Sequence, residues 1–139
     1  MNYKYTPPAL PSFARWRDLY KRFPNTSVLR ALEYETLAKV PLSGDVLDVG
    51  RGENALYSKH LPSDIALHSI NIDPKIAPTH LLEPDQPFPI KDNTYGTAIC
   101  LNTLEQVYNA KFMIDEIHRT RKPGGTVHIT VPFENGLQN

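Results

Sequence analysis

The sequence has little cysteine, no excess of charge of either sign and no long hydrophobic run. Its one cysteine, Cys100, excludes an internal disulfide and leads us to expect a reducing compartment, the cytoplasm. The 15 basic and 15 acidic side chains cancel, so the overall charge attracts neither nucleic acid nor an anionic membrane. The sequence also lacks an apolar signal segment and any run near the roughly 20 residues that cross a membrane. We therefore expect a globular protein without nucleic-acid or membrane partners.

Two helices are expected before residue 45. Apolar side chains recur at helical spacing from Phe13 to Phe23. A second helix is expected to begin after Ser27, its N-cap, and to end at Pro41. From Asp45 onward, short apolar strands alternate with helices. We therefore expect an N-terminal arm with two cap-like helices over residues 1–44 and a strand-and-helix domain over residues 45–139, within a single compact unit.

Five strands and two helices are expected after residue 45. Their alternation predicts a mostly parallel sheet with helices on its faces. Only five residues separate Asp73 from the third strand, fewer than the dozen or so of an ordinary parallel crossover, so we expect that strand to be vestigial. The fifth strand would lie close to a sheet edge, and we expect a partner, another subunit or further chain to cover it. The expected strands are 46–49, 65–72, 79–82, 97–101 and 126–131, and the expected helices are 54–60 and 110–121.

The stretch DVLDVGRGENAL, residues 45–56, is typical of a ligand-binding turn between a strand and a helix. Glycine at Gly50 and Gly52 lets the backbone turn sharply and lets a ligand approach without meeting a Cβ atom. The first amides of the following helix would face a phosphate or a carboxylate. Asp73 ends the next strand 23 residues after Gly50, where an acid can accept both hydroxyls of a ribose. This order of elements predicts a nucleotide-like cofactor.

Two cofactors are compatible with the turn. The spacing Gly50-x-Gly52-x-x-Ala55 satisfies the dinucleotide pattern and favours NAD. Asp48, two residues before the first glycine, would repel a pyrophosphate and would favour a ligand with an ammonium and a sulfonium group. S-adenosylmethionine has both, together with a carboxylate for the turn and a ribose for Asp73. The electrostatics therefore favour S-adenosylmethionine, and NAD stays open as the alternative.

Residues 45–133 resemble class I S-adenosylmethionine-dependent methyltransferases of the type 11 kind. VLDVGRGENAL is similar to their first cofactor motif, and NIDP to the acid that ends their second strand. LEPDQPFPIKDNTYGTAICLNTLEQVYN is similar to their passage from the adenine-contacting acid to the segment after the fourth strand, and FMIDEIHRTRKPGGTVHITVPF to their passage from a helix to the fifth strand. The resemblance implies a Rossmann-like α/β sandwich with strand order 3-2-1-4-5, helices on both faces, and S-adenosylmethionine as cofactor.

Carried over position by position, the resemblance implies a cofactor site at the carboxyl edge of the sheet. Asp48, Gly50 and Gly52 would hold the methionine end of the cofactor. Asp73 would bind the ribose hydroxyls. The adenine end and the floor of the site would be lined by residues that follow the third and fourth strands: Glu83, with Asp85 as its rival, at the adenine amine, and Leu101, Asn102 and Thr103 beneath the cofactor.

Three departures from the family pattern concern binding and catalysis. Asn54 stands where a third glycine is common, and Gly96 replaces an acid. Gln106 replaces a histidine that could act as a base in some relatives, which glutamine cannot do at neutral pH. The later strands of the family's sheet are also absent, so we expect a truncated or degenerate member.

The leading hypothesis is methyl transfer from S-adenosylmethionine to a small-molecule acceptor, because the neutral net charge does not favour nucleic acid. The alternatives are a non-catalytic methyltransferase-like domain for binding or interaction and, less favoured, an NAD-dependent oxidoreductase. No residue is assigned a catalytic role. Each of the five histidines is expected to be structural or at the surface, and no pair of them has a zinc-ligand spacing. Cys100 is expected in the core.

Overall fold

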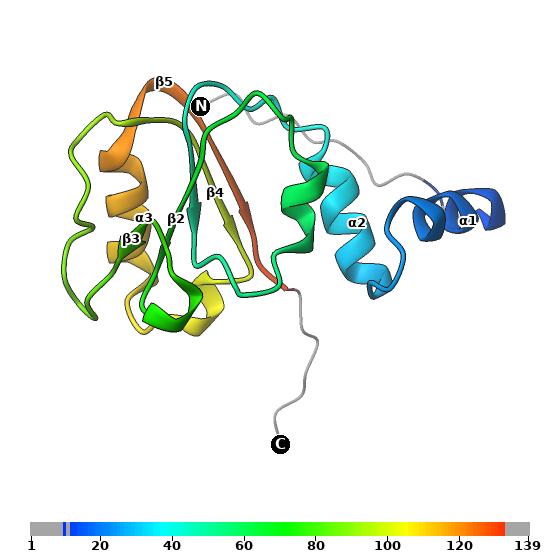
Figure 1. Cartoon of the computed structure of the whole chain (residues 1–139), viewed down its shortest axis with the longest axis horizontal. Helices are drawn as coiled ribbons and strands as arrows, with labels where there is room; N and C mark the ends of the chain where they lie inside the picture. The colour runs from blue at the N-terminus through cyan, green and yellow to red at the C-terminus, as the bar shows by residue number, and fades with distance from the viewer. Residues whose placement is uncertain (1–9, 11, 133–139) are drawn as a thin grey trace. The chain divides into compact units, whose positions relative to one another are not determined.

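The computed structural model describes residue 10 and residues 12–132. The chain divides into two compact units, Met1–Leu37 and Ala38–Asn139, whose elements are labelled in Figure 1. Most of the expected N-terminal arm before the first helix lies outside the described residues. None of the helices in the described part of the chain combines the length and the apolar character that a membrane crossing needs.

The first unit contains two helices, α1 (Phe13–Arg22) and α2 (Val28–Leu37). The side chain of Ser12 caps α1 by accepting a hydrogen bond from the Arg15 amide at 3.2 Å. Ser27 does the same for α2 through the Arg30 amide at 3.3 Å, which confirms the expected N-cap. The second helix ends at Leu37, earlier than the proline that the sequence predicted as its end.

Aromatic packing and one carboxylate hold the two helices of the first unit together. The rings of Phe23 and Tyr34 meet edge to face with centroids 5.9 Å apart. Glu35 of α2 accepts hydrogen bonds from two arginines of α1, from Arg15 at 2.7 Å and from Arg22 at 3.1 Å. Because Glu35 is buried, these charge-assisted bonds compensate the loss of water around its carboxylate.

The second unit is built on a five-stranded parallel sheet. Its strands are β1 (Val46–Val49), β2 (Leu67–Asn71), β3 (His80–Leu81), β4 (Tyr95–Leu101) and β5 (Arg121–Thr130). They lie in the order β3-β2-β1-β4-β5, all parallel to their neighbours, which confirms the predicted order. The connecting helices are α3 (Ala110–Thr120) and three short 3₁₀ helices, η1 (Leu56–His60), η2 (Pro74–Ile76) and η3 (Leu104–Gln106).

The third strand is as short as the sequence predicted, and η2 explains how so short a crossover can be parallel. Asp73 caps η2 by accepting a hydrogen bond from the Lys75 amide at 2.9 Å. Ala77 then adopts a left-handed backbone, φ 49°, which turns the chain back. Thr79 ties the returning chain to β2 through Ser69, with reciprocal amide-to-hydroxyl distances of 3.1 and 3.2 Å.

The fifth strand begins earlier than predicted. The sequence suggested that Pro123 and the two following glycines end the helix before the strand, but α3 ends at Thr120 and the ladder already starts at Arg121. A register shift between Tyr95 and Thr97 accommodates the extra residues, and Gly124 takes φ 75°. The Arg121 side chain closes this irregular stretch by donating to the Gly125 carbonyl at 2.8 Å.

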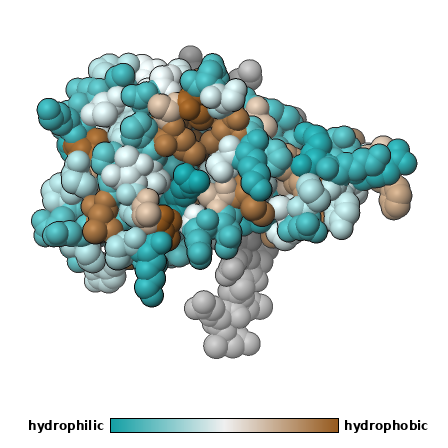
Figure 2. Space-filling model, in the orientation of Figure 1, coloured by the Kyte–Doolittle hydropathy of each residue, from teal (hydrophilic) through white to brown (hydrophobic). Residues whose placement is uncertain are grey.

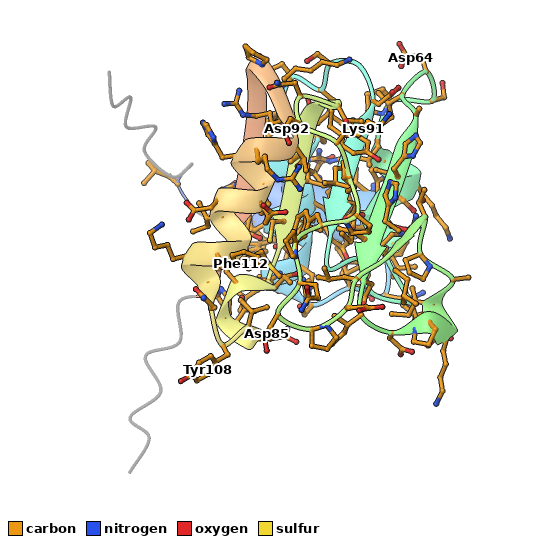
Figure 3. The ribbon with its side chains drawn as sticks, turned by 90° about the vertical axis from the view of Figure 1, so that its left-hand side faces the viewer. Asp64, Asp85, Lys91, Asp92, Tyr108 and Phe112 are labelled. Atoms are coloured by element: carbon orange, nitrogen blue, oxygen red, sulfur yellow. The ribbon has the colours of Figure 1, made fainter. Side chains whose placement is uncertain are left out.

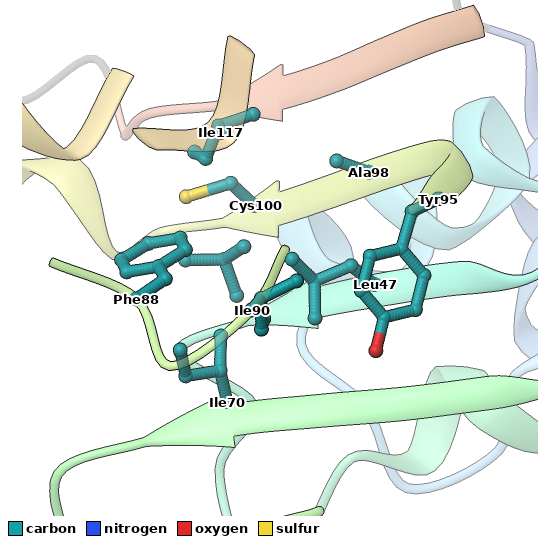
Figure 4. Close-up of a cluster of buried hydrophobic side chains, with 9 residues drawn as sticks. Leu47, Ile70, Phe88, Ile90, Tyr95, Ala98, Cys100 and Ile117 are labelled. Carbon is teal, nitrogen blue, oxygen red and sulfur yellow. The ribbon is translucent and has the colours of Figure 1, made fainter. Parts of the chain in front are cut away.

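One face of the sheet carries the main hydrophobic core. Figure 4 shows this cluster. Side chains of β1, β2, β4 and α3 pack there against Phe88 and Ile90, which lie in the loop before β4. The cluster consists of Leu47, Val49, Ile70, Phe88, Ile90, Tyr95, Ala98, Cys100 and Ile117. Side chains alternate along a strand, so Asp48 lies on the opposite face, toward η1. Within this unit, α3 and η1 therefore cover different faces of the sheet (Figure 1).

Arg119 of α3 holds the loop before β4 in place. Its guanidinium donates to the Phe88 and Ile90 carbonyls at 3.1 and 2.8 Å and to the Asp92 carboxylate at 2.6 Å. It also pairs with Glu116 at 2.6 Å, and Glu116 accepts a further bond from the Phe88 amide at 2.7 Å. This network holds the backbone of Phe88 and Ile90, whose side chains complete the hydrophobic core.

The outer edge of β5 has no partner strand among the described residues. Two of its side chains, Val127 and Ile129, remain more than a third exposed. Figure 2 shows one face of the molecule, on which hydrophobic patches lie within a largely hydrophilic surface. The coverage of this edge by a partner or by further chain stays a prediction.

Candidate functional site

Gly50 follows β1 and cannot be replaced by another residue without strain. Its φ is 78°, in the left-handed region that favours glycine. A Cβ atom at this position would lie 2.3 Å from the Thr103 side chain. Thr103 in turn bonds through its hydroxyl to the Val49 carbonyl at 3.3 Å and to the Leu101 carbonyl at 3.2 Å. The turn after β1 is therefore packed directly against the end of β4.

Gly52 lies in a different environment two residues later. A Cβ atom there would have no neighbour within 4 Å among the described residues. The intervening Arg51 carbonyl accepts a hydrogen bond from the Asn71 side chain of β2 at 2.9 Å. The turn is thus anchored on both neighbouring strands, and the space beside its second glycine is open.

The helix after the turn differs from the prediction. The sequence predicts a helix over residues 54–60 whose first amides face a ligand. The structure has the five-residue 3₁₀ helix η1 instead, and two of these amides already have partners. The Leu56 amide bonds to the Asn54 carbonyl at 2.7 Å and the Ser58 amide to the Ala55 carbonyl at 3.1 Å. These amides are consequently not available as a helix-start anion site.

Asp48 is a buried carboxyl group directly before the turn. It is 1% exposed, and its Oδ2 accepts a hydrogen bond from the hydroxyl of Tyr57, the second residue of η1. Burial raises the pKa of Asp48 to about 6, against the opposing effects of the Tyr57 hydrogen bond and the Arg51 charge. Nothing in the sequence singled out Tyr57, because its contact with Asp48 depends on the path of the chain after the turn.

Asp73 follows β2 at the same edge of the sheet. Its amide bonds to the Asn71 side chain at 2.9 Å, and its Oδ1 accepts the cap bond of η2 from the Lys75 amide. One carboxylate oxygen therefore has a local structural role. Asp73 is only partly exposed, and its second oxygen has no hydrogen-bond donor among the described residues.

The predicted residues after β3 and β4 differ in how firmly they are held. Glu83 and its rival Asp85 are exposed on the turn after β3, and Figure 3 shows Asp85 at the end of the unit opposite Asp64. Leu101 ends β4 and is partly buried. Asn102 takes φ 50°, and its amide bonds to the Thr130 carbonyl at 2.9 Å. Parallel strands end at one edge, so the structure places all of these positions at the carboxyl edge of the sheet.

Gln106, which stands where the methyltransferases that the sequence resembles have a histidine, has a local structural role. Its side-chain amide donates to the Asn102 carbonyl at 2.8 Å. It therefore stabilises the left-handed turn after β4.

Cys100 lies in the packed interior, and His68 and His80 are partly buried. Burial raises the pKa of the Cys100 thiol to about 12, which excludes a thiolate nucleophile and agrees with its expected place in the core. His80 lies 2.7 Å through its Nε2 from the Tyr95 hydroxyl, and the His68 ring stacks on it with centroids 6.3 Å apart. In the described part of the chain, no three histidine, cysteine or acidic side chains are placed to hold a metal ion.

Two pockets are lined by residues outside the glycine turn. One, of about 250 Å³, is apolar and lies within the first unit between Trp16, Phe23 and Val28. The other, of about 380 Å³, lies at the amino edge of the sheet, where Asp92, His118 and Arg121 line it. Neither pocket contains a residue that the sequence predicted for the cofactor site.

The sheet order and the glycine turn after β1 define a Rossmann-like α/β fold, with its ligand-binding edge at the carboxyl ends of the strands. Solved structures narrow this class to the methyltransferase fold. One is a complex between the Haloferax volcanii Trm112 methyltransferase activator and a protein described as a methyltransferase, with 18% identity, coverage of 86% of this chain and 57% of that chain, and a TM-score of 0.60.

Two further structures have the same fold. A protein from Methanococcus maripaludis, described as an S-adenosylmethionine-dependent methyltransferase, shares 18% identity over 93% of this chain and 68% of its own, with a TM-score of 0.59. An S-adenosylmethionine-dependent methyltransferase from Aquifex aeolicus shares 17% identity over 66% of this chain and 58% of its own, with a TM-score of 0.51. The chain thus spans less than two thirds of the Haloferax and Aquifex proteins.

No protein-family model matches the sequence, and no curated protein matches it either. At these identities the likeness to solved structures shows the fold alone.

Proposed function

We propose that this chain binds S-adenosylmethionine at the carboxyl edge of its sheet and takes part in methyl transfer. The observation that carries the proposal is the buried Asp48 carboxyl group beside the open glycine turn of a methyltransferase fold. Support also comes from the Methanococcus and Aquifex structures, which are described as S-adenosylmethionine-dependent. When bound, the cofactor supplies an activated methyl group for an in-line displacement.

The charge of Asp48 distinguishes the two candidate cofactors. Two unit charges about 4 Å apart interact by about 4 kcal/mol at an effective dielectric constant near 20. A carboxylate before the turn therefore attracts the ammonium or sulfonium group of S-adenosylmethionine and repels the pyrophosphate of NAD by comparable amounts. This difference favours S-adenosylmethionine, although the Gly-x-Gly-x-x-Ala spacing satisfies the dinucleotide pattern.

The other proposed contacts follow the edge of the sheet. Gly50 and Gly52 would let the methionine end approach the backbone, and Asp73 would accept the ribose hydroxyls with its free oxygen. The adenine end would lie near Glu83 or Asp85. Leu101 and Asn102 would form the floor of the site, for which the fixed backbone of Asn102 is suited.

The acceptor is proposed to be a small molecule, because the net charge of zero provides no general attraction to nucleic acid. The second candidate function is a methyltransferase-like binding domain without activity of its own. Gln106 favours it, since this side chain cannot take up a proton and is already bonded to the Asn102 carbonyl.

Calorimetric titration with S-adenosylmethionine, S-adenosylhomocysteine and NAD tests the proposal. We expect micromolar binding of the first two ligands and none of NAD. Heat with NAD alone would favour an oxidoreductase, and no heat with any ligand would refute cofactor binding. A methyltransferase assay then separates an active enzyme from a binding domain.

Two variants locate the site. Gly52→Ala adds a Cβ atom that meets none of the described residues, so the unfolding free energy should stay unchanged while cofactor affinity falls. Asp73→Asn keeps an acceptor for the Lys75 amide and removes the charge, which should weaken binding by roughly 1–3 kcal/mol. Asp64→Asn, an exposed change at the opposite end of the unit (Figure 3), is the matched control. Equal affinities of Asp73→Asn and the wild type would remove Asp73 from the site.

A further inference from the structure

The two oxygens of the Asp48 carboxyl group differ in their hydrogen bonding. Oδ2 accepts the hydroxyl proton of Tyr57. Oδ1 receives no hydrogen bond from any of the described residues, although the residue is 1% exposed. Oδ1 is not among the fully buried side-chain atoms that lack a partner in the described part of the chain, so this oxygen keeps a small access to solvent. A ligand at the open turn can therefore supply the donor that Oδ1 lacks.

Tyr57 is itself held firmly. It is 7% exposed, and it lies in η1, which is closed at both ends by backbone bonds. The Ser58 hydroxyl bonds to the Ala55 carbonyl at 2.8 Å, which stabilises the turn that leads into the tyrosine. The hydroxyl of Tyr57 is therefore presented to Asp48 by a rigid element.

We propose that Tyr57 is a positioning residue for the cofactor: its hydroxyl holds one oxygen of Asp48 and leaves the other available to a cationic group of the ligand. The inference rests on the proposed function and adds a residue to which neither the glycine turn nor the family resemblance assigned a role.

The hydroxyl is required because a buried carboxyl group tends to keep its proton. Burial raises the pKa of Asp48 to about 6, and the Tyr57 bond is the first of the two effects that lower it. The other groups around Asp48 are Arg51 in the turn, which lowers the pKa, and the thiol of Cys100 on β4, which is uncharged. The neighbours in register are Ser69 of β2 and Ile99 of β4, which do not titrate.

A proton and the cationic ligand therefore compete for the same carboxyl group. At a pH below about 6, binding of the cation displaces one proton from Asp48 to the solvent. The affinity for S-adenosylmethionine should accordingly rise with pH and level off once Asp48 is ionised. Without the tyrosine hydroxyl, this rise should move to higher pH, since the ionised form loses its donor.

The test compares the full chain with Tyr57→Phe, which keeps the ring and removes the hydroxyl. The affinity for S-adenosylmethionine is measured by calorimetry between pH 5 and pH 8.5. We expect the midpoint of the rise to move up by about one pH unit in the variant. Near pH 8.5 the two affinities should differ far less than at pH 6. Tyr108→Phe, which removes the hydroxyl of an exposed tyrosine (Figure 3), is the matched control and should reproduce the wild-type profile.

An unmoved midpoint in Tyr57→Phe overturns the inference, whether or not the affinity changes, because a purely structural tyrosine would not alter the titration of Asp48. If the variant does not fold, the wild-type chain decides through the ¹³C resonance of the Tyr57 ζ carbon. This resonance should shift as Asp48 titrates and again when S-adenosylmethionine binds, and a constant resonance overturns the inference. Absence of binding to the wild type at every pH refutes the proposed function itself, and this inference with it.

Discussion

Replacing Asp48 by asparagine should make the stability of the ligand-free chain less sensitive to pH. In the folded chain this carboxyl group is 1% exposed, and its pKa is raised from 3.8 to about 6, mainly by burial. The folded state therefore holds the proton more tightly than the unfolded state does. The contribution of Asp48 to the unfolding free energy of the wild type is therefore largest below pH 4, and it is lost as the pH rises through about 6. Asparagine does not titrate, so the variant lacks this loss.

The pKa shift sets the size of the effect. A rise from 3.8 to about 6 is roughly two units, and each unit corresponds to about 1.4 kcal/mol. Between about pH 4 and pH 7.5, the difference in unfolding free energy between Asp48→Asn and the wild type should therefore grow by about 2–3 kcal/mol in favour of the variant. Any constant cost of placing an amide beside Tyr57 is the same at both pH values and cancels.

Urea denaturation at the two pH values measures this change. Other titrating groups contribute equally to both proteins, so the comparison isolates Asp48. Asp64→Asn provides the control, because Asp64 is exposed and its replacement should give a difference that does not grow with pH. A difference for Asp48→Asn that is flat, or that favours the wild type at pH 7.5, would refute the burial of an ionisable group at this position. The same variant should lose affinity for S-adenosylmethionine, so stability and binding should change in opposite directions.

Three further results are expected. Gly50→Ala should lower the unfolding free energy by about 1–3 kcal/mol in urea denaturation, because its φ is positive and the new Cβ meets Thr103. Cys100 should react with a thiol reagent only at the rate of unfolding, and rapid labelling of the native chain would contradict its burial. Arg119→Met should cost about 2–4 kcal/mol at neutral pH. The hydrogen bond from Arg119 is the main cause that lowers the pKa of Glu116. The difference in unfolding free energy between the wild type and Arg119→Met should therefore shrink as the pH falls through the acid range. A difference that stays constant with pH would argue against the ion pair of Arg119 and Glu116.

Local sequence signals predicted most of the second unit. The alternation of short apolar strands with helices predicted a parallel sheet, and the family resemblance supplied its order. The five residues after Asp73 were too few for an ordinary crossover, which correctly predicted a minimal third strand. Boundaries were less accurate where backbone geometry overrode composition. Pro123 and the glycines after it looked like a helix end, but the ladder absorbs them as an irregularity opposite β4.

The sequence by itself determined the position of an acid and two glycines after an apolar strand, because such a pattern depends only on neighbours along the chain. It also predicted an acid, Asp73, at the carboxyl end of the next strand, and the structure has Asp73 two residues after the end of β2 at Asn71. Only the tertiary structure decided that Asp48 is buried, that Tyr57 donates to it, and that Thr103 requires glycine at position 50. These contacts join residues brought together by the path of the chain and by the pairing of β1 with β4. A spacing pattern does not encode them, since each depends on how separate elements pack.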